Sequence, residues 1–451
     1  MQPCVFQSAA HRLNWAIVFA AVAAFAAVAA YGSFLGYGTD RDSIRVIASA
    51  QSILGGAYQR SRSWGFPLHE AATALAYGAG GLPGANLLSA TVTLGGIGAA
   101  LCIVHKLAPG RVALAAVALC GSPLLLTNAS AAIDFGWSFA ASMVLLLAVL
   151  STQPAPMATS AATFLLLMIR PDNVLFAAPV AGALLLTDRR DGARRLAPFI
   201  VAGLAAAACY LLLERASVFL HGVSTTRPFP ARLARAAALG TAALGPGGLL
   251  ALAALPLYRP PQATKLAFLS RVTALAWALY LPRFIVLPDQ AEYLIIPVEL
   301  AILTALCALP PRAAGLCAVC TALPALVTLS LLQRSQADGA LKPHIALQPG
   351  AVAQDFAARR FASLMDQPAA KAAISASTRE TGLSYETYLP AFRTASGALI
   401  IGRQHAYRLR DARELGPVFV CDAPLGPGIG WRGWEAPVRQ SSVHICAPIN
   451  R

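Results

Sequence analysis

The chain has 451 residues, of which 57% are hydrophobic and only 12% are charged. Soluble domains carry about 25% charged residues, so this composition excludes an ordinary soluble protein and predicts that most of the chain lies in lipid. The formal net charge is +15, but the basic residues are scattered between apolar runs instead of gathering on one soluble face. This scatter argues against a nucleic-acid-binding protein.

Long apolar runs recur from Trp15 almost to Leu332, and a bilayer core needs about 20 such residues per helix. The first run is longer than the apolar part of a signal peptide, so we expect an uncleaved membrane helix. The apolar segment 66–82 is short and carries His69 and Glu70, which favours an interfacial helix. About eleven spans are predicted: 14–36, 85–105, 112–127, 134–151, 156–170, 173–187, 196–214, 236–257, 266–282, 292–309 and 313–332.

Basic residues in the short loops suggest a cytoplasmic N-terminus. With that orientation, the tight cytoplasmic loops carry Lys106, Arg111, Arg189, Arg190, Arg194, Arg195, Arg259, Lys265 and Arg312. The opposite loops, 37–65 and 215–235, also hold many arginines, so charge alone leaves the orientation open.

After Leu332 the composition becomes polar, and 334–451 is predicted to form a small extracytoplasmic α/β domain outside the transmembrane domain 1–333. The stretch Ala353–Met365 has helical spacing, whereas Ala398–Gly402 and Val418–Cys421 are typical of short strands. Outside the cytoplasm Cys421 and Cys446 could form a disulfide or remain two free thiols.

The first external loop, within 37–84, holds two acids and several arginines directly after the first span. Asp40 and Asp42 are candidates to deprotonate an acceptor or to hold a divalent metal ion, although they supply few hard oxygens by themselves. Arginine guanidiniums suit phosphate oxygens, and a lipid phosphate lies at this depth. The competing interpretation is a solvated loop whose charges pair with each other.

Further charges stand at the predicted outer ends of helices. Asp134 opens one span, and Arg170-Pro-Asp172 joins two spans with almost no loop. Charges within a membrane are costly and therefore point to function. Arg283 belongs to a proline-broken segment that is followed by Glu292-Tyr293-Leu-Ile-Ile-Pro297. Irregular backbone at membrane depth is tolerated only where protein or a cavity covers it.

These elements together resemble the glycosyltransferase-C superfamily, the polyprenyl-phosphate-sugar enzymes that include protein mannosyltransferases and the aminoarabinose transferase of lipid A. The resemblance covers most of 14–332. It is carried by an acid after span one, here Asp40 or Asp42, by Gly65-Phe-Pro-Leu68, and by Glu292-Tyr293-Leu294 with Pro297. The adjacent acid pair of the superfamily is replaced by Asp40-Arg41-Asp42, which leaves open which aspartate is catalytic.

The resemblance implies a membrane glycosyltransferase whose donor is a sugar linked through phosphate to a polyprenol and whose acceptor attacks with inversion. Asp40 or Asp42 would be the base. The implied acceptor is a glycan, lipid or protein, with no nucleic acid involved, and the implied location is the bacterial inner membrane. Candidate substrate-binding residues are Tyr58, Arg60, Arg62, Glu70, Asp134, Arg170, Asp172, Arg283, Glu292 and Tyr293.

Two other functions fit the same charges. A transporter or lipid flippase would use intramembrane charges and broken helices equally well, although no inverted repeat is evident. A non-catalytic assembly protein would bind a partner through its external domain. The sequence contains no convincing phosphate-binding loop for a nucleotide, which agrees with a lipid-linked donor.

Overall fold

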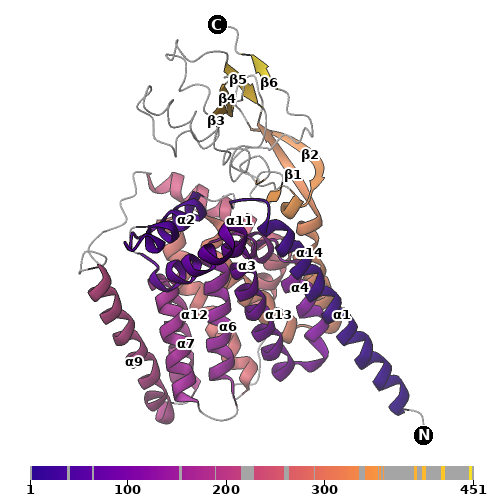
Figure 1. The fold of residues 1–451 in the computed structure, drawn as a ribbon. Helices are drawn as coiled ribbons and strands as arrows, with labels where there is room; N and C mark the ends of the chain where they lie inside the picture. The colour runs from indigo at the N-terminus through magenta and orange to yellow at the C-terminus, as the bar shows by residue number, and fades with distance from the viewer. Residues whose placement is uncertain are drawn as a thin grey trace.

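A computed structural model of the chain describes residues 3–37, 41–62, 65–151, 155–187, 189–214, 228–257, 264–288, 290–334 and 341–353. It also describes residues 355, 356, 359, 391–393, 399–402, 418–421 and 446–448. Most of these residues form a body of helices, and the strands lie beyond one end of it (Figure 1). Helices dominate because lipid offers no partners to backbone N–H and C=O groups, which helices satisfy internally.

In chain order the helices are α1 (Pro3–Ser33), α2 (Arg41–Leu54), α3 (Pro67–Leu107), η1 (Pro109–Arg111), α4 (Val112–Gly121), α5 (Pro123–Ala129), α6 (Phe135–Val149), α7 (Pro156–Ile169), η2 (Pro171–Asn173), α8 (Val174–Thr187), α9 (Arg189–Glu214), α11 (Phe229–Ala254), η3 (Leu255–Leu257), α12 (Lys265–Val286), η4 (Ala291–Leu294), α13 (Ile295–Ala308) and α14 (Pro311–Leu326).

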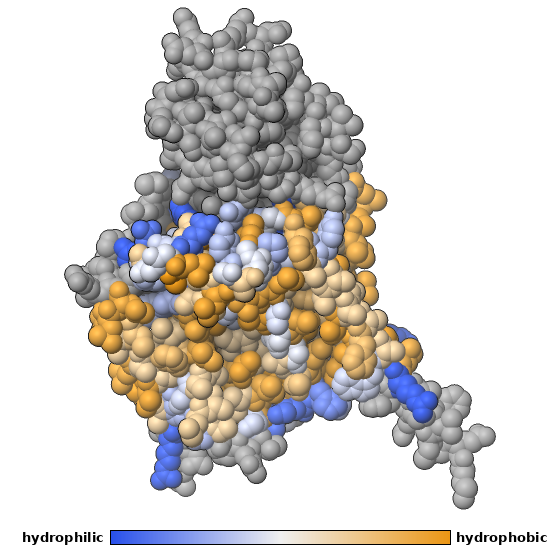
Figure 2. Space-filling model, in the orientation of Figure 1, coloured by the Kyte–Doolittle hydropathy of each residue, from blue (hydrophilic) through white to orange (hydrophobic). Residues whose placement is uncertain are grey.

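Six helices of the described chain are long and apolar enough to cross a membrane, and the bent pair α4–α5 could form a seventh span. Four further apolar helices, α6, α7, α8 with η2, and α14, are 10–17 residues long. The polytopic helical fold is therefore confirmed, whereas the predicted number of eleven spans is not. On the face that Figure 2 shows, the middle of the body is mainly hydrophobic, with hydrophilic residues toward both ends.

Small residues let the helices approach closely. A Cβ atom added to Gly96 of α3 would lie 2.5 Å from Cα of Ala140 in α6, so this crossing requires glycine. Such small-residue contacts are typical of helices that associate in lipid. Gly81, with φ +62, sits in a kink that separates the first part of α3, at the predicted interfacial segment, from its long apolar part.

The last predicted span is wrong in its final residues. α14 ends at Leu326, and Val327–Arg334 forms strand β1 instead of helix. β1 pairs in antiparallel fashion with β2 (Leu341–Pro349), and its Val-Thr-Leu-Ser alternation is typical of a strand. By hydropathy alone, a Leu-rich run favours a helix and a strand equally. Pairing with β2 is what makes this segment a strand.

A second sheet has the strand order β3 (Ala391–Arg393), β4 (Leu399–Gly402), β5 (Val418–Cys421) and β6 (Cys446–Pro448). The strands β4 and β5 lie within the segments predicted to be extended. Within the predicted helix Ala353–Met365, residues 353, 355, 356 and 359 are helical, and the rest lies outside the described residues. Cys421 and Cys446 are register partners on the antiparallel strands β5 and β6.

Candidate active site

Asp134 stands at the centre of a group of charges at the end of the helical body that carries α2. It occupies the turn between α5 and α6 and is fully buried. Its Oδ1 accepts a hydrogen bond from Arg62 Nη2, and its Oδ2 accepts one of 2.7 Å from Arg170 Nη1. One carboxylate thus holds two guanidiniums that come from distant parts of the chain.

Arg170 occupies the corner between α7 and η2, where Pro171 starts a new helical turn. Its Nε and Nη2 donate to the two carboxylate oxygens of Asp172, each at 2.9 Å. The guanidinium also lies over the rings of Phe135, at 4.6 Å, and Tyr293, at 5.3 Å. Bidentate pairing and stacking on rings hold this cation in one orientation. We call Arg62, Asp134, Arg170 and Asp172 the Asp134 cluster.

Burial by itself raises the pKa of Asp134, but Arg170 and Arg62 outweigh it and hold this pKa well below its usual range. Asp134 is therefore a permanent anion at neutral pH, which makes it a poor general base. Its physical role in the cluster is to bring two cations close together without mutual repulsion.

Asp42 lies beside this cluster. It is near the start of α2, 7% exposed, and its carboxylate oxygens are 3.3 Å from Arg45 Nη1 and 3.5 Å from Arg62 Nη1. Gln290 Nε2 contacts the same carboxylate at 3.4 Å. Through Arg62, Asp42 is therefore linked to Asp134. Asp40, the other predicted base, lies outside the described residues.

The remaining loop residues divide into an anchor and an exposed group. Glu70 at the start of α3 is fully buried, and its two oxygens accept hydrogen bonds from Tyr58 Oη, at 2.7 Å, and from the backbone N–H of Ser61, at 2.8 Å. This arrangement fixes the loop that delivers Arg62. Arg60 is exposed. Glu70 and Tyr58 thus support the loop, and the substrate-binding role expected of them stays a prediction.

A pocket opens next to Arg170 and encloses about 390 Å³, its open mouth included. Its polar lining includes Arg170, Asp172, Arg283 and Glu292. Its apolar lining includes Phe135, Leu175, Phe284, Ile295 and Ile296. Ligand pockets commonly combine an apolar wall with a few polar groups in this way.

Arg283 supplies the pocket with a second cation. Its guanidinium lies 5.4 Å from the ring centroid of Tyr293, and within the described part of the chain it forms no ion pair. Tyr280, one turn earlier on α12, is buried at the pocket wall, and its hydroxyl has no hydrogen-bond partner among the described residues. An unpaired cation and an unpaired donor together fit an anionic, oxygen-rich ligand.

The structure brings together most of the residues that the sequence singled out. Arg62, Asp134, Arg170, Asp172, Arg283, Glu292 and Tyr293 lie in the Asp134 cluster or in the adjoining pocket, and Asp42 contacts the cluster through Arg62. The sequence analysis missed Tyr280 and Gln290, whose residue types carry no signal on apolar or loop segments. It named Phe66, which lies against Arg62, only as part of Gly65-Phe-Pro-Leu68. Among the described residues there is no group of three metal-ligating side chains, so a metal ion at Asp40 and Asp42 stays a prediction.

The sequence matches no protein-family model and no curated protein. The fold is similar to that of ArnT from Cupriavidus metallidurans. The apo ArnT structure matches with a TM-score of 0.50 and 18% identity, over 68% of this chain and 62% of that chain. ArnT bound to undecaprenyl phosphate matches with a TM-score of 0.51 and 17% identity, over 66% of this chain and 62% of that chain.

The matched region thus spans less than two thirds of the length of ArnT. ArnT is an aminoarabinose transferase of the glycosyltransferase-C superfamily. Structural similarity agrees with the superfamily that the sequence resembles, although identity this low establishes the fold and leaves the reaction open. The chain is a multi-pass helical membrane protein with an ArnT-like fold.

Proposed function

We propose that this protein is a membrane glycosyltransferase that moves a sugar from a polyprenyl-phosphate donor to an acceptor on the extracytoplasmic side of the membrane, in a bacterial inner membrane. The observation that carries the proposal is the pocket that Arg283 and Arg170 line together, in which Arg283 forms no ion pair with any residue that the structure describes. The ArnT-like fold supports it, and so does the undecaprenyl phosphate bound to one ArnT structure.

The negative charge that develops on the phosphate during the reaction explains why arginines lie at the site. The acceptor oxygen attacks the anomeric carbon, the bond from that carbon to the phosphate oxygen breaks, and the acceptor proton passes to a carboxylate. The phosphodiester of the donor carries one negative charge, and the released polyprenyl phosphate carries up to two. Cations at the leaving phosphate therefore stabilise the transition state more than the bound donor, and this difference accelerates the reaction.

The carboxylates divide between two roles in this proposal. Asp134 and Asp172 orient Arg170 and remain ionised, so they serve the phosphate indirectly. Asp42 or Asp40 takes the proton of the acceptor, a contribution worth about 10²–10⁴-fold in rate. The apolar wall of the pocket would face the first isoprene units of the donor.

Release of undecaprenyl phosphate tests the proposal without knowledge of the sugar. Purified protein in lipid nanodiscs is given undecaprenyl-phosphate-linked sugars together with lipid or glycan acceptors, and free undecaprenyl phosphate is measured by mass spectrometry. We expect release with at least one donor and a strong loss in Arg283→Met. A protein that bound undecaprenyl phosphate, released none from any donor and moved the lipid between leaflets of proteoliposomes would instead be a flippase.

A further inference from the structure

Arg359 is the largest fully buried side chain in the described part of the molecule, although it follows the last membrane helix by more than thirty residues. Its side chain is 1% exposed. Burying a cation is costly unless it is paired and hydrogen bonded. The contacts of Arg359 therefore show how its buried charge is compensated.

The guanidinium of Arg359 caps the end of a short helix. Its Nη2 donates to the backbone oxygen of Thr127 at 2.7 Å, and its Nη1 donates to that of Ser130. Thr127 lies in the last turn of α5 and Ser130 is its C-cap, and carbonyls at such an end lack backbone N–H partners within the helix. The Thr127 oxygen also accepts a long hydrogen bond of 3.4 Å from Ser130 Oγ. The positive charge also suits the negative end of the helix dipole. Asp355, one turn earlier, balances the charge with an ion pair of 2.7 Å to Nε.

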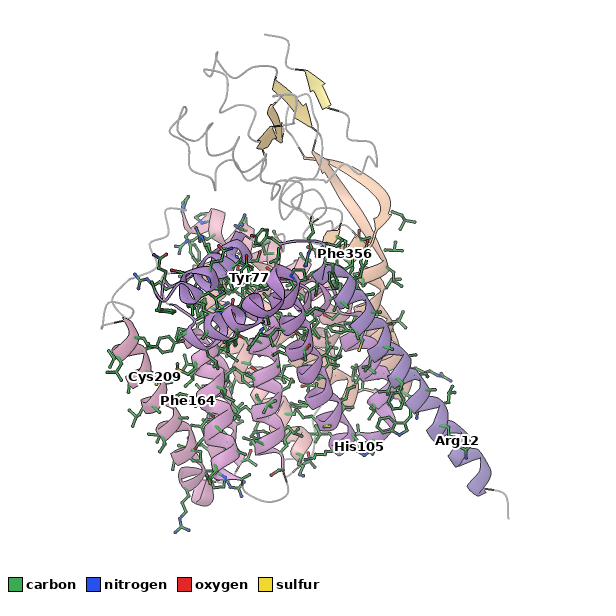
Figure 3. All side chains as sticks on the ribbon, viewed as in Figure 1. Arg12, Tyr77, His105, Phe164, Cys209 and Phe356 are labelled. Carbon is green, nitrogen blue, oxygen red and sulfur yellow. The ribbon has the colours of Figure 1, made fainter. Side chains whose placement is uncertain are left out.

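The surrounding chain holds this contact in place. Gly350 N–H donates to Leu326 O at 2.8 Å, and Ala351 and Val352 are buried in the main hydrophobic core. Phe356 packs edge-on against Tyr31 at the end of α1, with ring centroids 5.6 Å apart. Figure 3 shows Phe356 at the end of the helical body where Tyr77 also lies, away from His105 and Arg12.

The capped end of α5 leads directly into the active-site cluster. From Ser130 the chain makes a buried turn of a few residues and reaches Asp134, which holds Arg62 and Arg170. Every residue of this turn is at most 3% exposed. A buried turn has few ways to satisfy its backbone groups, so a change in the cap displaces the carboxylate that follows.

We propose that Arg359 is a positioning residue for the glycosyl transfer, because it fixes the α5–α6 turn that delivers Asp134 to the two arginines. Arg359, which lies outside the membrane helices, is thereby part of the catalytic unit. The expected effect on kcat rests on the proposed function. The expected effect on the structure of the α5–α6 turn does not.

The test compares Arg359→Met with a matched control. Arg111→Met removes an arginine that likewise caps a helix, by donating to Leu309 O at 3.0 Å at the C-terminal end of α13, with no proposed site residue following. Arg359→Lys keeps the charge and part of the donor capacity. Hydrogen–deuterium exchange of peptides covering 130–138 is measured in nanodiscs, alongside release of undecaprenyl phosphate under multiple-turnover conditions.

We expect hydrogen–deuterium exchange in 130–138 to rise on the order of tenfold in Arg359→Met, because this substitution removes the buried hydrogen bonds that cap α5. Arg111→Met removes a cap from α13 instead, so exchange in 130–138 should stay at the wild-type rate. The kcat should fall roughly 10- to 100-fold with the donor KM nearly unchanged, since misplaced groups lose transition-state stabilisation first. Arg359→Lys should recover part of both effects.

Unchanged exchange in 130–138 would overturn the proposal. Faster exchange with wild-type kcat would refute the link to the site. Faster exchange in a protein whose wild type transfers no sugar would leave the positioning of the turn intact and contradict the proposed function instead. Equal losses of kcat in Arg359→Met and Arg111→Met would reduce Arg359 to a residue of general stability.

Discussion

Arg170 Nη1 donates a hydrogen bond of 2.7 Å to Asp134 Oδ2, although 36 residues and a complete helical hairpin separate the two in the chain. Asp134 is fully buried and is bonded to Arg62 as well. Removal of one partner from such a pair leaves an uncompensated charge, which typically costs about 3–5 kcal/mol.

The substitution Asp134→Asn should therefore destabilise the protein strongly. It leaves Arg62 and Arg170 facing each other without the shared anion, whereas Asp172→Asn leaves Arg170 paired with Asp134. Asp172 is also more exposed, at 28% of its side chain. Thermal unfolding in detergent should show a clearly larger decrease in Tm for Asp134→Asn, and similar decreases for the two variants would contradict this ranking.

The lowered pKa of Asp134 also predicts how stability depends on pH. A carboxyl whose pKa is depressed by folding stabilises the protein above its unfolded pKa, and this contribution is lost as the pH falls toward the folded value. The loss should begin near the ordinary carboxyl value of 3.8. Unfolding of wild type and Asp134→Asn from pH 7 to pH 3 measures it: the difference in Tm should shrink at the acid end, and a constant difference would argue against an ionised Asp134.

Arg283→Met should weaken binding of undecaprenyl phosphate by roughly 10- to 150-fold, the equivalent of a charge-assisted hydrogen bond of about 1.5–3 kcal/mol. Arg271→Met is the matched control, because Arg271 lies on the same helix but donates to Thr187 Oγ1 outside the pocket. Native mass spectrometry with undecaprenyl phosphate measures both. If the two variants bound equally well, Arg283 would have no part in holding the phosphate.

Tyr280→Phe should separate ligand binding from stability. The hydroxyl of Tyr280 has no partner in the described structure, so its removal should leave the Tm unchanged while donor affinity falls about 2- to 10-fold, the worth of a neutral hydrogen bond. Tyr210→Phe should behave in the opposite way, because its hydroxyl donates to Leu167 O at 3.1 Å away from the pocket. A lower Tm with unchanged affinity in Tyr280→Phe would mean that the hydroxyl has a structural role.

The sequence was sufficient to locate the charged residues but not to pair them. Insertion cost places Asp134, Arg170 and Arg283 near the ends of helices, since charges at a helix centre are expensive. Hydropathy cannot say that one carboxylate serves two arginines 72 and 36 residues away, because helix packing decides that. The same limit explains why Tyr280 was missed: a tyrosine on an apolar helix carries no sign that a pocket lies beside it.

The structure of the C-terminal region was harder to predict from the sequence than the pairing of the charged residues. Hydropathy treated Val327–Leu332 as the end of a helix, because burial in a sheet and burial in lipid select the same Leu and Val residues. Arg359 lay in a predicted helix outside the membrane, where an arginine normally faces solvent. Its burial depends on the carbonyls at the end of α5, which belong to a segment more than 200 residues earlier in the chain.

The last prediction concerns Asp40 and Asp42, one of which is expected to be the base. One proton needs one base, so asparagine at the catalytic position should lower kcat by at least about 10²-fold while donor binding stays close to wild type, and asparagine at the other should have a mild effect. Asp42 is within reach of Arg62, Arg45 and Gln290, so Asp42→Asn also frees Arg62 to bind Asp134 alone.

That rearrangement would also weaken donor binding, and the two explanations can therefore be separated. If Asp42 is the base, Asp42→Asn should lower kcat while the donor KM stays close to wild type, whereas displacement of Arg62 would raise the donor KM as well. Asp40→Asn, measured in parallel, provides the comparison. Equal and mild losses in the two variants would remove the general base from the first loop.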